Sequence, residues 1–120
     1  MKGAKVLMVD DDPNILKFVS ANLRARGFDV TTAEDGETAL KIVEQAMPNL
    51  IILDLLMPGI GGAEVCRRIR EWSDVPIIIL TAIGESKTRM ELKSLGASDY
   101  ITKPFDIPDF LQIVRVALEQ

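Results

Sequence analysis

The residues with the clearest chemical potential in this sequence lie where short apolar runs end. They are four acids, one threonine and one lysine: Asp10, Asp11, Asp12, Asp54, Thr81 and Lys103. Carboxylates that are brought together away from water repel one another, so a group of them needs a cation. An all-oxygen site with room for water and phosphate oxygens suits Mg²⁺, and Mn²⁺ is a chemical substitute. The predicted chemistry is phosphoryl transfer assisted by a metal ion.

Asp54 follows the apolar segment LIIL, which would hold its backbone rigidly. A carboxylate held in this way can attack phosphorus and form an aspartyl phosphate. Lys103 would pair with the acids or with a phosphoryl oxygen, and Thr81 would donate a hydrogen bond to another oxygen. The simpler alternatives are solvated acids, a surface lysine and an ordinary strand end. Asp12 fits a structural role, because an acid directly before Pro13 is typical of a helix N-cap.

Five short apolar runs predict strands that are buried on both faces. They are Lys5 to Val9, Val30 to Ala33, Leu50 to Leu53, Ile77 to Leu80 and Tyr100 to Thr102. Between and after these runs, apolar residues recur at helical spacing. The stripes are Ile15, Leu16, Val19 and Leu23; Ala39, Leu40, Val43 and Met47; Val65, Cys66, Ile69 and Trp72; and Phe110, Leu111, Val114 and Leu118. A thinner stripe of Met90, Leu92 and Leu95 predicts a further helix within residues 85–95.

This alternation of strands and helices predicts an α/β fold, with a parallel sheet covered by helices on both faces. Ligands of such sheets bind beyond the carboxyl ends of the strands. Those ends carry the acids, the threonine and the lysine, so the order of elements predicts that they converge. Gly27 and Gly96 stand where helices are expected to stop.

Length and composition limit the alternatives. With 120 residues, of which 48% are hydrophobic, the chain is expected to form one domain over residues 1–120. Histidine, the commonest general base and metal ligand, is absent, and the single Cys66 allows neither an internal disulfide nor a thiolate cluster. No apolar run approaches the roughly 18 residues of a membrane span, so we expect a soluble, cytoplasmic protein. A net charge of −4 disfavours nonspecific attraction of this domain to nucleic acid or to an anionic membrane.

Four motifs carry a resemblance to a known family. In order, they are VDDDP, LIILDLLMPGIGG, IIILTA and DYITKPF. Together they resemble the receiver domain of bacterial two-component response regulators, of the kind found in chemotaxis regulators, over essentially the whole chain. The resemblance implies the flavodoxin-like five-stranded parallel sheet of order 2-1-3-4-5 with five helices, an order known for a receiver domain. It also implies that Asp54 accepts a phosphoryl group from the phosphohistidine of a sensor kinase.

The resemblance assigns metal ligands residue by residue. Asp11 and Asp54 would bind Mg²⁺ directly, together with the backbone carbonyl of Leu56. Asp10 would act chiefly through water. The family commonly has an acid at the position of Gly61, but this departure removes no ligand.

The resemblance also implies a phosphoryl pocket and a switch. Ala82 would leave room for the phosphoryl group, and Pro104 would follow Lys103 through a cis peptide bond. Thr81 and Tyr100 would form the switch pair, in which the hydroxyl turns toward the phosphoryl group and the ring turns inward. This change would bias a surface made mainly by the fourth helix, fifth strand and fifth helix.

The implied partners are a sensor histidine kinase or phosphotransfer protein, and an output domain or partner protein. A homodimer that depends on phosphorylation is a further expectation. Beyond its own phosphorylation and dephosphorylation, the domain is expected to catalyse no reaction.

Three other functions compete with this interpretation. A phosphohydrolase with an aspartate nucleophile usually has a second acid two residues later, where this chain has Leu56. A flavin or nucleotide binder would need a phosphate loop where this chain has three acids, and Gly59, Gly61 and Gly62 are better explained by a turn. A degenerate receiver used only for docking would not need the intact set of acids, Thr81 and Lys103.

Overall fold

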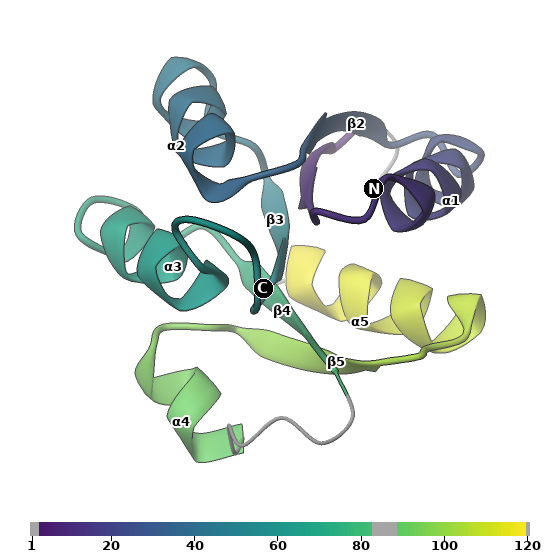
Figure 1. Ribbon diagram of the computed structural model, residues 1–120. Coiled ribbons are helices and arrows are strands. Elements are labelled where there is room, and N and C mark those ends of the chain that lie inside the picture. Colours follow the sequence, from purple (N-terminus) through teal and green to yellow (C-terminus); the bar gives the residue numbers. More distant parts are fainter. Residues whose placement is uncertain (1–2, 83–88, 120) are drawn as a thin grey trace.

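The computed structural model describes residues 3–82 and 89–119, with five strands and five helices in strict alternation (Figure 1). In chain order they are β1 Lys5–Val9, α1 Pro13–Arg24, β2 Asp29–Ala33, α2 Gly36–Gln45, β3 Leu50–Asp54, α3 Gly62–Arg70, β4 Ile77–Ala82, α4 Arg89–Ser94, β5 Asp99–Lys103 and α5 Ile107–Leu118. The predicted α/β class is therefore confirmed.

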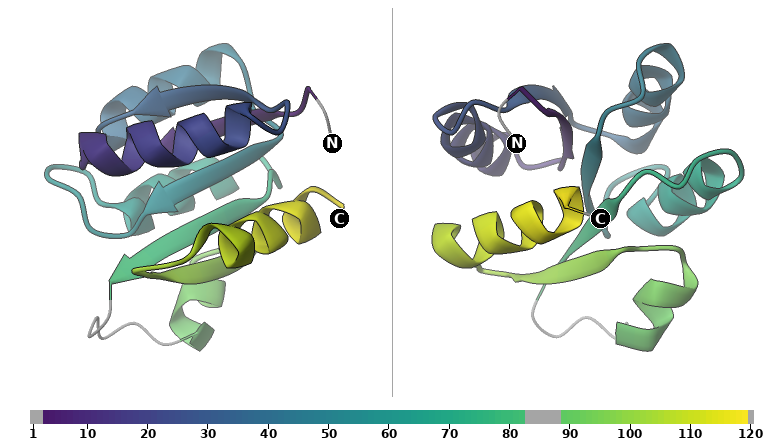
Figure 2. Two further views of the ribbon diagram at one scale, coloured as in Figure 1. Left: turned by 90° about the vertical axis from the view of Figure 1, so that its right-hand side faces the viewer. Right: turned by 180° about the vertical axis from the view of Figure 1, so that it is seen from behind.

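The five strands form one parallel sheet in the order β2-β1-β3-β4-β5, as expected. Each parallel connection needs a crossover, and the helix between two strands supplies it. Because all strands run the same way, their carboxyl ends and the loops that follow lie along one edge of the sheet (Figure 2).

Helices cover both faces of the sheet, and each face has its own apolar core (Figure 1). One core packs α1 and α5 against alternate strand residues, and the other packs α2, α3 and α4 against the remaining ones. All five residues of β3 are buried, which explains why this strand is apolar without alternation.

The predicted helix ends are also confirmed. The Asp12 side chain caps α1 by accepting a 2.9 Å hydrogen bond from the Asn14 backbone N–H, and Pro13 occupies the first turn. Gly27 and Gly96 follow α1 and α4 with φ values of +89° and +98°, which glycine adopts without a steric penalty.

Some element boundaries differ from the prediction. The backbone pairing continues further than the apolar runs, so Asp54 and Lys103 are the last residues of β3 and β5 rather than the residues after them. The placement of Trp72 on a buried helical stripe was wrong, because α3 ends at Arg70 and the Trp72 side chain is 53% exposed. The expected helix within 85–95 is present as α4, and residues 85–88 lie outside the described residues.

In the part of the chain that the structure describes, no helix is long and apolar enough to cross a membrane.

Candidate functional site

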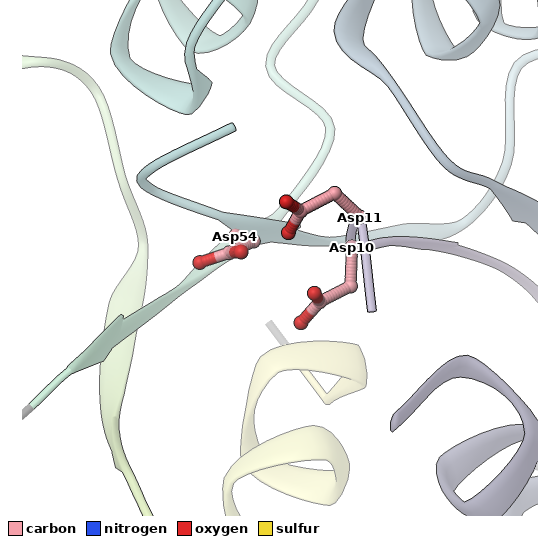
Figure 3. A group of neighbouring side chains, drawn as sticks. All are labelled: Asp10, Asp11 and Asp54. Atoms are coloured by element: carbon pink, nitrogen blue, oxygen red, sulfur yellow. The ribbon is translucent and has the colours of Figure 1, made fainter. Parts of the chain in front are cut away.

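The sheet register brings the acids at the ends of β1 and β3 together. Val9 is paired with Leu53, so Asp10, directly after β1, lies beside Asp54, the last residue of β3. One carboxylate oxygen from each of Asp10, Asp11 and Asp54 lies within 4.8 Å of the others. Figure 3 shows the three side chains grouped at this edge of the sheet. The convergence that the strand order predicts is therefore present.

Asp10 is fully buried, and both of its carboxylate oxygens accept hydrogen bonds from the protein. The Asp12 backbone N–H donates to Oδ1 at 2.9 Å, and the Lys103 ammonium donates to Oδ2 at 2.8 Å. A buried carboxylate needs such donors, because an ionised group without partners is costly to remove from water. Asp10 is thus held in one position by the chain itself.

Lys103 links the end of β5 to both buried acids. Its Nζ lies 2.8 Å from Asp10 Oδ2 and 3.5 Å from Asp54 Oδ2. Burial lowers the pKa of Lys103, but the hydrogen bond to Asp10 and the negative charges of Asp10 and Asp54 outweigh this effect, so the pKa is raised. Lys103 therefore stays protonated at neutral pH. The peptide bond between Lys103 and Pro104 is cis, as the resemblance implied.

Asp54 is a buried carboxylate whose pKa is raised by its surroundings. Its burial and then the negative charge of Asp10 raise its pKa from 3.8 to about 6, although the charge of Lys103 acts in the opposite direction. The side chain is ionised at neutral pH but retains an excess of nearby negative charge. Any added positive charge at this edge would stabilise the ionised form.

The donor set of this cluster fits a divalent cation. Three carboxylates and one ammonium leave a net charge of −2 when all are ionised. Asp11 is exposed, while Asp10 and Asp54 are buried, so an ion at the cluster would have protein oxygens on one side and water on the other. This acidic cluster can bind a metal ion, and oxygen ligands with retained water are typical of Mg²⁺ sites.

Thr81 and Tyr100 lie on the same face of the sheet. Ile79 is paired with Tyr100 and Thr81 with Thr102, and alternate residues of a strand share a face. Thr81 is buried, one position beyond the Asp54–Leu80 pair. The half-buried Tyr100 packs against the core that contains α3 and α4. Both predicted switch residues thus lie on the α4 side of the sheet.

The loop after β3 contains two features that bear on the site. Leu56, whose backbone carbonyl is an expected metal ligand, exposes 64% of its side chain to solvent. Gly62, which the sequence indicated only as a turn residue, begins α3 directly against the backbone of Asp54. A Cβ at Gly62 would overlap the Asp54 carbonyl oxygen and lie 2.9 Å from Leu55 Cα. The double glycine was the only signal of this close approach, and it did not distinguish Gly62 from Gly61.

Comparison with known proteins decides the family. The family model described as "Response regulator receiver domain" matches residues 6–115. The chain belongs to this family. It is a receiver domain of two-component signalling, which disfavours the phosphohydrolase and nucleotide-binder alternatives.

Individual relatives support this family assignment. The receiver domain is 45% identical in sequence to "Probable transcriptional regulator ycf27" of Guillardia theta, over 97% of this chain and 46% of that protein. It is 40% identical to the DNA-binding transcriptional regulator RpaA of Synechocystis sp., over 97% of this chain and 49% of that protein. The solved structure of the chemotaxis response regulator CheY4 of Vibrio cholerae has a TM-score of 0.90 and 35% identity, covering 98% of this chain and 100% of that one. The receiver domain spans about half the length of the curated relatives it matches.

Proposed function

We propose that this receiver domain accepts a phosphoryl group on Asp54 from the phosphohistidine of a sensor histidine kinase or phosphotransfer protein. The observation that carries the proposal is the placement of the Asp54 carboxylate, which ends a fully buried strand 3.5 Å from the Lys103 ammonium and beside two further acids. A nucleophile needs a fixed position, and a phosphoryl acceptor needs positive charge near the oxygens of the transferred group.

The reaction follows from this arrangement. A carboxylate oxygen of Asp54 attacks phosphorus and forms a P–O bond while the P–N bond to the donor imidazole breaks. The imidazole nitrogen keeps the electron pair and is protonated, and Asp54 becomes an acyl phosphate. Lys103 pairs with a phosphoryl oxygen or with Asp10 as the charge on Asp54 changes. Attack by water later releases inorganic phosphate and restores Asp54, so the domain would catalyse only its own phosphorylation and dephosphorylation.

We assign Mg²⁺ as the metal, with Mn²⁺ as a substitute. Asp11, Asp54 and the Leu56 backbone carbonyl would hold it, and Asp10 would act through water. The two hydrogen bonds that Asp10 accepts support this division, because they engage both of its oxygens. When bound, Mg²⁺ supplies positive charge that screens the repulsion between a carboxylate and a phosphoryl group.

The remaining residues would shape the pocket and report its state. Ala82 is exposed and is paired with Lys103, so its small side chain leaves room beside the lysine. We propose that the Thr81 hydroxyl donates to a phosphoryl oxygen and that Tyr100 turns inward in response. Because both lie on the α4 side of the sheet, the charge change would reach α4 and β5 first, and through them the surface that these elements form with α5.

A surface beside the site fits a protein donor. A hollow of about 320 Å³ is lined by apolar residues of α1, among them Ile15 and Phe18, and by Lys103, Pro104 and Phe105. The Phe18 side chain is 56% exposed. An apolar patch at the rim of a charged site is suited to docking a partner helix.

The response would pass to an output domain or partner protein, and a phosphorylation-dependent homodimer is a further proposal. Relatives that are transcriptional regulators support an output in transcription. The net charge of −4 supports an output that does not depend on nucleic-acid binding by residues 1–120 themselves. We propose that these residues form one functional domain that works in the cytoplasm.

Intact mass spectrometry tests the acceptor. The protein is incubated with acetyl phosphate and Mg²⁺, beside Asp54→Asn and a sample with chelator. We expect a gain of one phosphoryl group, about 80 Da, in the wild-type sample alone. Labelling of Asp54→Asn would move the acceptor to another residue, and undiminished labelling with chelator would remove the metal from the mechanism.

A further inference from the structure

A second hollow lies on the face of the sheet that α1 and α5 cover (Figure 1). Its volume is about 470 Å³, and it is lined by Arg26, Phe28, Pro108, Leu111 and Arg115. The first two residues stand in the connection from α1 to β2, and the other three belong to α5. It shares no lining residue with the acidic cluster or with the hollow beside Lys103, so it is a separate feature of the surface. We call it the arginine hollow.

The floor of the arginine hollow is apolar. Phe28 and Leu111 belong to the core beneath α1 and α5, and each exposes 8% of its surface. The exposed Pro108 extends this apolar surface outward. The methylene stems of the two arginines add apolar surface at the rim, as long basic side chains commonly do. An apolar side chain that enters the hollow would therefore be removed from water on several sides, which favours binding.

The rim of the arginine hollow is positive. Both arginines are exposed, and no acid is among the described residues that line the hollow. Arg26 Nη1 donates a 3.0 Å hydrogen bond to the Asn22 carbonyl, and Arg115 Nη2 donates a 2.7 Å hydrogen bond to Gln112 Oε1. Over residues 3–82 and 89–119, neither guanidinium forms an ion pair. Because an arginine has five N–H donors, each keeps its charge and several donors for an added anion.

Two exposed arginines of α3 show the contrast. Arg67 and Arg68 both pair with Glu64 of the same helix, at 2.6 Å and 2.8 Å. The chain as a whole has an excess of acids, with a net charge of −4, yet the arginine hollow has two cations and no counter-charge among its described lining residues. A carboxylate that enters the hollow would be attracted by both guanidinium groups, whose planar donors match its two oxygens.

We propose that the arginine hollow binds an acidic segment of a partner protein, in which an apolar side chain is flanked by aspartate or glutamate. The apolar side chain rests on Phe28 and Leu111, and the flanking carboxylates accept hydrogen bonds from the two arginines. A nucleic acid fits less well, because the net charge of −4 repels an extended polyanion and a sugar-phosphate backbone has no group for the apolar floor. The proposal does not depend on phosphorylation of Asp54, which lies in the separate acidic cluster.

Fluorescence anisotropy with a labelled synthetic peptide tests the charges in the full chain. The probe carries leucine and phenylalanine flanked on each side by paired glutamates, and its control carries glutamines in their place. We expect the glutamate probe to bind at least about tenfold more tightly than the control, with an affinity that falls as salt is added. Arg26→Gln and Arg115→Gln should each weaken binding by about threefold, and the double variant by about tenfold. Arg68→Gln, the matched control, should bind as the wild type does.

The apolar floor is tested by changing the probe, because replacing the core residues Phe28 and Leu111 would disturb folding. A glutamate probe with serines in place of leucine and phenylalanine should bind about tenfold more weakly. In amide NMR spectra of the ¹⁵N-labelled protein, the original probe should shift the signals of Phe28 and Leu111 and leave that of Asp54 in place. Asp54→Asn should bind the probe as the wild type does, so a failure of phosphorylation at Asp54 would leave this proposal standing.

Four outcomes would overturn the proposal. The first is no binding of the glutamate probe at millimolar concentration, or equal binding of the glutamine control. The second is equal affinity of the wild type, Arg26→Gln and Arg115→Gln. The third is tighter binding of single-stranded DNA or phosphatidylglycerol vesicles that the same two variants weaken, which would assign the hollow to phosphate groups. The fourth is a wild-type dimer in sedimentation that Arg115→Gln separates, which would assign the hollow to a second copy of the chain.

Discussion

Lys103 Nζ donates a 2.8 Å hydrogen bond to Asp10 Oδ2, across 93 residues of sequence and across β3 and β4, the two strands that separate β1 from β5 in the sheet. The same ammonium lies 3.5 Å from Asp54 Oδ2. One cation therefore offsets the charge of two buried acids.

Lys103→Met is expected to destabilise the protein at neutral pH. Removing one partner of a buried ion pair leaves the remaining charges uncompensated, which costs about 3 kcal/mol. Urea unfolding measures this loss, and millimolar Mg²⁺ should restore part of it because the ion compensates the same acids. Lys41→Met, at an exposed position of α2, is the control. Equal stability of the two variants would reduce Lys103 to a surface lysine.

Asp54→Asn is expected to stabilise the metal-free protein above pH 6. The folded state raises the Asp54 pKa from 3.8 to about 6, so it holds this proton more tightly than the unfolded chain does. The ionised form is therefore destabilising, fully so above about pH 6 and not at all below about pH 4. The gain from Asp54→Asn should reach about 1–3 kcal/mol at pH 7.5 and vanish by pH 4. Urea unfolding across this range measures it, and a gain independent of pH would contradict the electrostatic cause.

Mg²⁺ affinity is expected to be nearly constant above pH 6.5 and to weaken at lower pH. Protonated Asp54 cannot act as a ligand, so binding below its pKa of about 6 must release a proton. Isothermal titration calorimetry should show an apparent Kd that rises about tenfold per pH unit below pH 5.5. Repeating the titration in buffers with different ionisation enthalpies gives the number of protons that are released on binding. Unchanged affinity at pH 5 would exclude Asp54 as a ligand.

Gly62→Ala is expected to disturb the loop that leads from Asp54 into α3. The added methyl group would overlap the Asp54 carbonyl oxygen, and the backbone must shift, at a cost of about 1–3 kcal/mol. Gly61→Ala is the matched control, because its Cβ would be 3.5 Å from the Leu55 carbonyl oxygen, an ordinary contact. Thermal unfolding and the rate of labelling by acetyl phosphate should both change in Gly62→Ala only. Identical behaviour of the two variants would refute the close approach.

Ser20→Ala is expected to stabilise the protein by about 1 kcal/mol. Ser20 is 2% exposed, and among the described residues its Oγ is buried without a hydrogen-bond partner. Removing an unsatisfied hydroxyl removes its desolvation penalty. Ser98→Ala provides the contrast, because Ser98 Oγ accepts a hydrogen bond from Ile77 N–H and its loss should destabilise. A lower melting temperature for Ser20→Ala would indicate that the hydroxyl has a partner in solution.

Much of the site was predictable from the sequence because the alternation of strands and helices is encoded locally, whereas the order of the strands in the sheet came only from the family resemblance. Continuous apolar runs indicate buried parallel strands, and parallel strands must return through helices, so Asp54, Thr81 and Lys103 had to reach one edge of the sheet. The acid, proline and glycine residues at helix ends determine where a helix begins or ends through contacts with residues only a few positions away. Such contacts are readable from spacing alone, as the Asp12 cap of α1 illustrates.

Distances between elements were decided only by the tertiary structure. Spacing alone did not distinguish Asp10 from Asp11, and only the family resemblance gave them different roles, whereas packing buries Asp10 between two donors and leaves Asp11 exposed. The raised pKa of Asp54 depends on burial and on a charge from another strand, neither of which spacing along the chain reports. The same holds for Arg70, whose partner Gly96 is 26 residues away. Local pattern determined which groups meet at the edge of the sheet, and three-dimensional packing determined which of them are paired, charged or exposed.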